Sequence, residues 1–424
     1  MKMLLTQLTA NGQVSDYKIN IHQKESCELF FVKGKLETVR RTDTCDKEIT
    51  VYVAHDGTMG DARFFVYPST TEDDVRNLIE EAVGKALLIH NPLYTLPEGE
   101  TGSYQVASNF SEYDPWELAQ QVSEAVFAAN TMENGSLNSV EVFINKHTES
   151  VINSRGLHKT QVRYDAMVET IPTYNGEAQS VELYHQYNFS ALDMDALHAE
   201  VAQKMAEVKG RYEAVHPEEI APCKVILSQQ EVSELFWNFA DDLNYSRVYS
   251  HSNLYKKGDT VQNDRTGDPI GITMAGALTG CVRSAKFDAD GMALGSVRII
   301  DDGKAVNYHG ANRFGQYLGE EPTGILRCMQ VDVGTAEEAD ITEGPYLQVL
   351  SMSGLQVDFF SDYIGGEVRL AYYHDGESVR AVTGISISGK LSQVLGSIRL
   401  SKESTVYNSF VGPRQAILQD MKIF

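Results

Sequence analysis

The chain has 424 residues, of which 42% are hydrophobic, so it is long enough for two to three domains and a large core. Its 36 Lys and Arg residues face 59 Asp and Glu residues, and the resulting formal net charge of -23 repels phosphate backbones. Direct binding to nucleic acid is therefore not expected. No apolar run approaches the roughly 18 residues of a membrane-spanning helix, so a membrane protein is not expected either.

The cysteines and the N-terminal segment indicate a compartment. The five cysteines are odd in number, scattered and never arranged as C-x-x-C, which is typical of reduced thiols rather than of a disulfide framework or a zinc finger. The stretch "MKMLLTQLTANG" has one Lys and no adequate apolar core, so it does not resemble a secretory signal. We therefore expect a cytoplasmic protein.

The first half of the chain alternates predicted strands with predicted helices. Residues 49–67 form two alternating apolar runs around Asp56-Gly57, a residue pair that favours a hairpin turn. A helical apolar stripe then runs from Val75 to Leu87, a second helix begins at Pro115, and a third ends near Gly210.

The strongest candidate for a domain boundary is "VHPEEIAPC", residues 215–223, because Pro217 and Pro222 lie close together. We place an N-terminal α+β domain at residues 1–221 and a β-rich C-terminal domain at residues 222–424. Most of the second half predicts strands, with hairpin turns at Asp302-Gly303 and Asp375-Gly376. The predicted fold class is α+β, a mixed α/β region followed by a domain of antiparallel, barrel-like sheets.

The helix that opens the second half has two different faces. One face carries apolar residues at helical spacing, namely Val232, Leu235, Phe236, Phe239, Ala240 and Leu243. The other face presents Glu234, Trp237, Asn238 and Asp241, with Asp242 at its edge. A lone Trp among acids and an amide is unusual for a simply solvated surface. This face is therefore either a solvated or packing surface or a substrate cleft.

No other motif forms a self-sufficient active site. The eleven His residues never form H-E-x-x-H, which a zinc helix of that class requires. "GISISG" at 384–389 misses the G-x-S-x-G nucleophile elbow, and "FDADG" at 287–291 lacks the remaining ligands of a calcium loop. Hydrogen-bonded histidines, a strand with a glycine turn and a plain turn are the favoured interpretations.

Several blocks of sequence carry a family resemblance in their order and spacing. They are "VINSRGLHKTQ" (151–161), "KVILSQQEVSELF" (224–236), "KFDADGMALGSVRIIDDGKAVNYHGANRFGQYLGEEPTG" (286–324), "AVTGISISGKL" (381–391) and "VGPRQAILQDMKI" (411–423). Together they are similar to the TldD/PmbA family, the so-called modulators of DNA gyrase. The resemblance implies an N-terminal α+β region, a β-rich C-terminal domain and a zinc peptidase formed by two homologous subunits. In the TldD-type subunit, the helix that opens the C-terminal domain carries His-Glu-x-x-x-His. Its two imidazoles bind zinc, its Glu is the general base, and a Cys near the C-terminus completes the ligands.

The chain departs from that motif at every functional position. Trp237, Asn238 and Asp242 stand where the motif has His, Glu and His. Trp cannot bind a metal, Asn cannot accept a proton at neutral pH, and a single Asp is a poor ligand set for zinc. No Cys follows Cys328, and the matching region reads "TVYNSFVGP". The resemblance therefore implies the PmbA-type subunit, also called TldE, with no catalytic residue, metal or cofactor of its own and with zinc only in a homologous partner.

Two functional hypotheses follow. In the first, the chain is a non-catalytic subunit, paired with a TldD-like partner or with itself, that helps bind unfolded peptide by adding it to an exposed sheet edge. In the second, it is a stand-alone hydrolase or peptide-binding protein, for which His251 or His309 with nearby acids are candidate ligands. The first is favoured because a hydrolytic zinc site needs about three convergent protein ligands. A direct gyrase or DNA modulator is a third hypothesis, and the charge of -23 argues against it.

Overall fold

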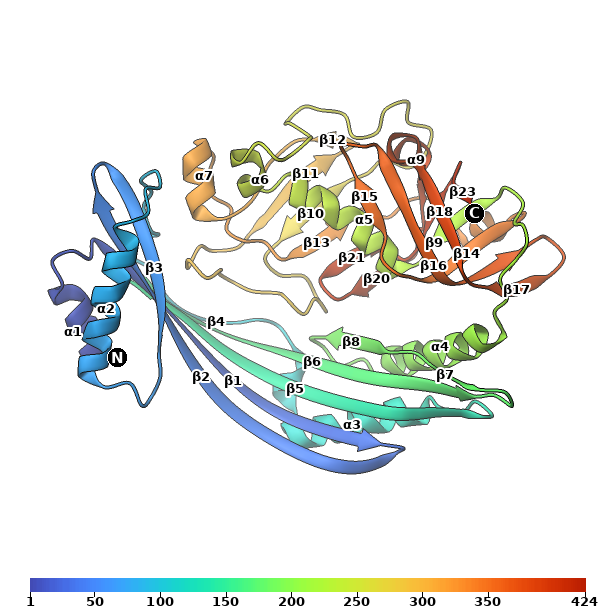
Figure 1. Cartoon of the computed structure of the whole chain (residues 1–424), viewed down its shortest axis with the longest axis horizontal. Helices are drawn as coiled ribbons and strands as arrows, with labels where there is room; N and C mark the ends of the chain where they lie inside the picture. The colour runs from blue at the N-terminus through green and yellow to red at the C-terminus, as the bar shows by residue number, and fades with distance from the viewer.

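A computed structural model describes residues 1–424 and has the α+β architecture that the sequence predicts. The N-terminal half contains a long, curved and mainly antiparallel sheet that passes beneath the C-terminal half (Figure 1). Its strands run in the order β3-β2-β1-β5-β6-β4, and β7 and β8 also pair with β6. The bounds are β1 Asp16–Val32, β2 Lys35–His55, β3 Thr58–Val66, β4 Thr101–Gln105, β5 Gly135–Asn153, β6 His158–Asn175, β7 Ser180–Glu182 and β8 His185–Phe189.

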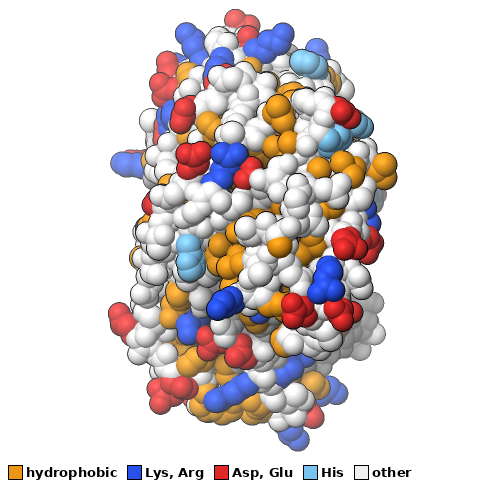
Figure 2. Space-filling model, turned by 90° about the vertical axis from the view of Figure 1, so that its left-hand side faces the viewer, with side chains coloured by type: hydrophobic (Ala, Val, Ile, Leu, Met, Phe, Trp, Pro, Cys, Tyr) orange, Lys and Arg blue, Asp and Glu red, His pale blue; other side chains and the backbone are white.

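Helices cover this sheet at two places. Near one end, α1 (Lys2–Ala10) and α2 (Glu72–Ala86) pack on β1 to β3, and Thr71 caps α2 with a capping box. Figure 2 shows that end of the molecule, where hydrophobic side chains gather near the centre of the face among charged ones. Further along, η1 (Asn109–Glu112), α3 (Pro115–Ala128) and α4 (Met194–Glu213) enclose a second core against β1, β5 and β6. The three long helices of this half are those that the apolar stripes predict.

The C-terminal half contains two sheets. A six-stranded sheet has the order β12-β11-β10-β13-β21-β20, and a nine-stranded sheet has the order β19-β22-β9-β14-β16-β18-β23, with β15 and β17 also on β16. The strands are β9 Lys224–Leu227, β10 Ile272–Ala275, β11 Ser296–Asp301, β12 Lys304–Ala305, β13 Cys328–Val331, β14 Tyr346–Met352, β15 Gln356–Asp358, β16 Tyr363–His374, β17 Val379–Val382, β18 Ile385–Lys390, β19 Arg399–Leu400, β20 Ser404–Tyr407, β21 Phe410–Pro413, β22 Ala416–Leu418 and β23 Lys422–Ile423. The division at residues 221 and 222 stays a prediction.

One helix occupies the core between these sheets (Figure 1). It is α5 (Gln229–Asp242), and all six residues of its predicted apolar stripe are buried in a single cluster with residues of both sheets. The short helices α6 (Tyr245–Tyr249), α7 (Asn312–Leu318), α8 (Glu338–Thr342) and α9 (Leu391–Ser397) lie in the connections. None of the helices is both long and apolar enough to cross a membrane.

Several groups of contacts join the halves, and two of them contain ion pairs. The loop 286–292 of the C-terminal half lies on the curved sheet, where Lys18 pairs with Asp290 and the Lys159 ammonium donates to the Gly291 carbonyl at 3.0 Å. Two strands away, near the same end of the sheet, Arg313 of α7 forms an ion pair with Asp61 of β3 at 3.2 Å. These ion pairs anchor the C-terminal half to the N-terminal sheet.

The core role of α5 leads to a prediction about Phe239. This side chain is 0% exposed, and its ring lies 4.9 Å from that of Phe359, centroid to centroid. We expect Phe239→Ala to lower the free energy of unfolding by roughly 3 to 5 kcal/mol, because the cavity cannot close completely. Urea unfolding measures the change. Phe360→Ala is the control, because Phe360 is 68% exposed and its loss should matter little. Equal destabilisation by the two variants would contradict the placement of α5.

A second prediction concerns Glu231, which is buried on α5 without a hydrogen-bond partner for its Oε2 atom. Burial raises the pKa of Glu231 to about 7. Because this pKa is above that of the unfolded chain, the proton stabilises the fold at low pH, and this stabilisation is lost as the pH rises through about 7. Glu231→Gln imitates the protonated form, so it should raise the free energy of unfolding at pH 8 by roughly 1 to 3 kcal/mol and have little effect near pH 5. Urea unfolding at the two pH values tests this. Glu177→Gln, at an exposed position, should change neither value.

Candidate functional site

The side chains on the polar face of α5 interact with nearby residues of the C-terminal half. The Glu234 carboxylate accepts from the Leu355 backbone N–H at 3.1 Å, and Asn238 donates to the Glu234 carbonyl at 2.8 Å. Trp237 is half-buried against the core of its own C-terminal half, and Asp241 is exposed and pairs with Arg247 at 2.7 Å. These side chains already have partners within the chain.

Asp242 is the most constrained of the motif positions. It is buried, and its two carboxylate oxygens accept from the backbone N–H groups of Leu254 and Tyr255 at 2.7 and 2.9 Å. Burial raises the pKa of Asp242, while the two backbone hydrogen bonds act in the opposite direction. The carboxylate therefore fixes the loop after α6 and does not face an open site.

The alternative histidine ligands do not converge on α5 either. His309 is buried, and its Nε2 atom bonds to the Ala240 carbonyl oxygen at 2.8 Å, so the ring supports the helix backbone. Burial lowers the pKa of His309 and keeps it neutral. His251 is exposed after α6. The residues present at α5 therefore do not fit a zinc ion, since no set of His, Cys, Asp or Glu groups with ligand spacing forms there.

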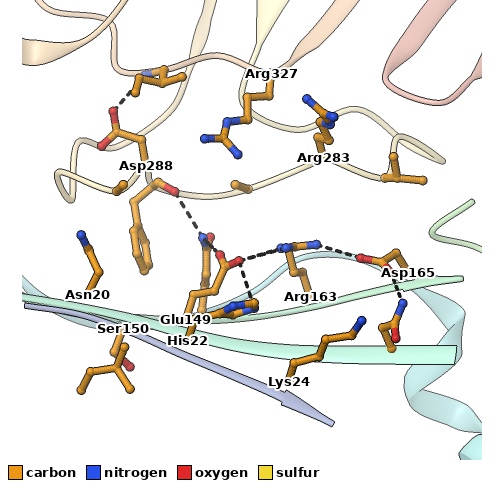
Figure 3. A pocket seen from close by; sticks show the side chains of 18 of the residues that line it. Asn20, His22, Lys24, Glu149, Ser150, Arg163, Asp165, Arg283, Asp288 and Arg327 are labelled. Atoms are coloured by element: carbon orange, nitrogen blue, oxygen red, sulfur yellow. Dashed lines mark hydrogen bonds and ion pairs between the residues drawn. The ribbon is translucent and has the colours of Figure 1, made fainter. Parts of the chain in front are cut away.

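A large cleft lies elsewhere, between the concave face of the N-terminal sheet and loops of the C-terminal half (Figure 3). Its volume is about 720 Å³. Strands β1, β5 and β6 form one wall, and the loops 282–294 and 325–327 form the other. None of Glu234, Trp237, Asn238 and Asp241 lines this cleft, so their role in substrate binding stays a prediction.

A polar cluster covers the sheet wall of the cleft because strand register places alternate residues on one face. His22 of β1 is opposite Glu149 of β5, and on β6 Gln161 is opposite Glu149 and Arg163 is opposite His147. His22 Nε2 and His147 Nδ1 are 2.9 Å apart. These residues, 125 positions apart in sequence, meet only because β1 and β5 are neighbours.

Two carboxylates hold this cluster in place. Asp165 Oδ2 lies 2.8 Å from His147 Nε2, and Arg163 donates to Asp165 at 2.9 Å and to Glu149 at 3.0 Å. Gln161 donates to the second Glu149 oxygen at 2.8 Å. Burial opposes ionisation of Glu149, but Arg163, the Gln161 hydrogen bond and His22 together outweigh it and hold the pKa of Glu149 below its usual value. Burial and then His147 lower the pKa of His22, so its neutral form is favoured.

The opposite wall contributes positive charge. Arg283 and Arg327 project from the C-terminal loops toward the cleft (Figure 3), and neither guanidinium pairs with a carboxylate of the chain. Asp288 is buried in the same wall, where it accepts the N–H groups of Asp290, Met292 and Ile325. The "FDADG" segment is therefore a carboxylate-stabilised turn, as its sequence predicts.

Sequence reasoning did not identify His22, His147, Glu149, Arg163 or Asp165 as site residues. The available signal is the period-two polar pattern in "NKHTE" (145–149) and "QVRYD" (161–165). That pattern is equally typical of a solvated sheet face. Only the position of the C-terminal half over this face distinguishes a cleft wall from a solvated sheet face.

The bonds of Asp242 generate a prediction. Asp242→Ala should lower the free energy of unfolding by about 1 to 3 kcal/mol, because two N–H groups lose their acceptor. Asp241→Ala is the matched control, since it removes only an exposed ion pair worth about 0 to 1 kcal/mol. Urea unfolding of both variants provides the comparison. Loss of stability in the control alone would contradict a structural role for Asp242.

Comparison with known proteins assigns the family. Residues 221–423 match the model of the PmbA/TldA metallopeptidase C-terminal domain. TldE from Thermococcus kodakarensis has a similar fold, with a TM-score of 0.80 and 15% identity over 100% of this chain and 99% of that one. Two proteins named as modulators of DNA gyrase also match over 100% of this chain. The one from Thermotoga maritima has a TM-score of 0.75 and 15% identity over 99% of its length. The one from Bacteroides thetaiotaomicron has a TM-score of 0.79 and 12% identity over 97% of its length. No curated protein matches the sequence. The C-terminal half of the chain, residues 221–423, therefore belongs to the TldD/PmbA family, and the whole chain has a TldE-like fold.

Proposed function

We propose that the chain is a non-catalytic, TldE-like subunit of a metallopeptidase and that it binds unfolded peptide for cleavage by a zinc-bearing, TldD-like partner. The observation that carries this proposal is which residues α5 has at the positions of the zinc-binding motif. At the motif positions the helix has Trp237, Asn238 and a buried Asp242 that is engaged by two backbone N–H groups. The helix is retained as a core element, while the groups needed for zinc hydrolysis are absent from it.

The cleft supports peptide binding. It is large enough for several residues of an extended chain, and its polar walls offer donors and acceptors to a peptide backbone. Arg283 and Arg327 are suited to carboxylates, because a guanidinium donates in a planar fork. An unfolded peptide with acidic side chains or a free C-terminal carboxylate is the ligand class that this cleft favours.

A free sheet edge supports the same proposal. Residues 35–46 of β2 pair with β1 on one side only, since β3 pairs with residues 47–55. An unpaired strand edge presents free N–H and C=O groups. An extended peptide can form hydrogen bonds with them and so add a new strand to the sheet. Arg40, on this free segment, also lines the cleft. The edge and the cleft are therefore close enough for one peptide to contact both.

The partners of the proposal are a homologous TldD-like subunit or a second copy of this chain, together with unfolded peptide. Nucleic acid and membrane are not among them, because the net charge of -23 disfavours phosphate backbones and lipid anions alike. A cytoplasmic location would bring the chain together with such a partner.

Peptide binding can be measured by fluorescence anisotropy with a labelled, reduced and carboxymethylated protein as the unfolded ligand. We expect the double variant Arg283→Ala and Arg327→Ala to weaken binding at least fivefold, because both cleft guanidiniums are lost. Arg369→Ala, an exposed position on β16 outside the cleft, is the control for lost charge. Equal weakening of peptide binding in the control variant would argue against the cleft as the peptide-binding site.

The subunit role needs a second measurement. The purified chain should not cleave the unfolded protein by itself, and adding it to a His-Glu-x-x-x-His homologue from the same source should increase cleavage. Chelator-sensitive hydrolysis by this chain alone would refute the non-catalytic assignment and favour the stand-alone hydrolase.

A further inference from the structure

We propose that His22, His147 and Glu149 bind a divalent transition-metal ion of the zinc class on the concave face of the N-terminal sheet. Their ligand atoms all lie within 4.8 Å of one another. The cluster is in the N-terminal half, outside the residues that match the metallopeptidase domain, and it shares no residue with α5. It is independent of the proposed subunit role and departs from the expectation of no metal, which rests on the α5 motif and the missing C-terminal Cys.

Strand geometry fixes two of the three ligands. His147 and Glu149 are two residues apart on β5, so both side chains project from the same face of the sheet. His22 is the register partner of Glu149 on β1, and its Nε2 atom lies 4.0 Å from Glu149 Oε1. Rigid neighbouring strands therefore bring two imidazoles and a carboxylate together, which is a ligand set that catalytic zinc sites use.

The imidazole spacing is close to what a metal requires. His22 Nε2 and His147 Nδ1 are 2.9 Å apart, with ring planes 5° from parallel, so in the absence of a metal they share one N–H···N hydrogen bond. Two nitrogens at about 2.0 to 2.1 Å from a tetrahedral ion are roughly 3.3 Å apart. Metal binding would replace the shared proton and would need His22 to turn. Its side chain is 42% exposed, so it has room for this rotation.

Side chains next to the three ligands orient them, as residues around the ligands of a metal site do. Asp165 Oδ2, at 2.8 Å from His147 Nε2, favours the tautomer that leaves Nδ1 free to bind a metal. Gln161 and Arg163 position the Glu149 carboxylate. Glu149 and Asp165 contribute two carboxylates to the cluster, against the one guanidinium of Arg163.

The site would remain open on one side. Three protein ligands leave a fourth position of a tetrahedral ion free, and His22 and Glu149 both line the 720 Å³ cleft. A water molecule or a carboxylate in the cleft could occupy that position.

The test uses zinc itself as the probe. The full-length chain is dialysed against a chelator and then titrated with zinc in competition with a chromogenic zinc indicator. We expect one equivalent to bind with a dissociation constant in the micromolar range or below. His22→Gln and His147→Gln should each weaken binding at least tenfold, and Asp165→Asn, which keeps all three ligands, should weaken it by a smaller factor.

The control is His158→Gln, at an exposed position on β6 that is not part of the cluster. This variant should bind zinc like the wild type. If His147→Gln fails to fold, His22→Gln decides the test, because its half-exposed side chain is not part of a hydrophobic core. Cobalt(II) provides a second readout, with visible absorption bands in the wild type that His22→Gln loses. No zinc binding at 100 micromolar, or equal binding by His22→Gln and His158→Gln, would overturn the proposal and leave the cluster as a hydrogen-bond network.

Discussion

The docking of the loop 286–292 on the concave face of the N-terminal sheet is the contact on which the cleft depends. Lys159 is only 2% exposed, and a buried ammonium without partners would strongly destabilise the fold. Its partners are the Gly291 carbonyl of that loop and Glu100, while Lys18 pairs with Asp290 in the same loop. Gln161 adds two further hydrogen bonds to this segment. Its amide nitrogen donates to the Phe287 carbonyl, and its amide oxygen accepts from the Lys286 N–H. Because these charged and polar groups gain their remaining partners when the halves meet, the polar face of the sheet becomes a cleft wall.

The two polar centres of the chain differ in how completely their groups are engaged. On α5, Glu234, Asn238 and Asp242 bond to backbone groups of the helix and its neighbouring loops. This arrangement stabilises the C-terminal half and leaves no ligand atoms directed at a common point. On the sheet, by contrast, His22 and Glu149 keep part of their surface open to the cleft. A histidine pair with an outer carboxylate retains the capacity to bind an ion or a ligand.

Local charge in the cleft differs from the charge of the whole molecule. The chain carries a net charge of -23, which disfavours phosphate backbones approaching its outer surface. Among the residues that line the cleft, however, five are basic and four are acidic (Lys24, Arg40, Arg163, Arg283 and Arg327 against Glu28, Glu149, Asp165 and Asp288). Enclosed charges are screened less than exposed ones, so a peptide carboxylate inside the cleft would respond mainly to the nearby guanidiniums. The overall acidity therefore excludes one class of partner without excluding anionic peptides.

The sequence by itself determined the elements whose signal is local. The apolar stripe of α5 and the hairpin at Asp56-Gly57, where both residues have positive φ, follow from side-chain periodicity and turn chemistry. The replacement of the motif residues by Trp237, Asn238 and Asp242 is also evident from the sequence alone. Only the tertiary structure decided which polar residues form a site. His22 and His147 lie on strands of 17 and 19 residues whose polar alternation is the same for a solvated face and for a cleft wall. The difference arises from strand pairing and from the C-terminal loops that lie over the face, both of which are contacts between residues distant in sequence.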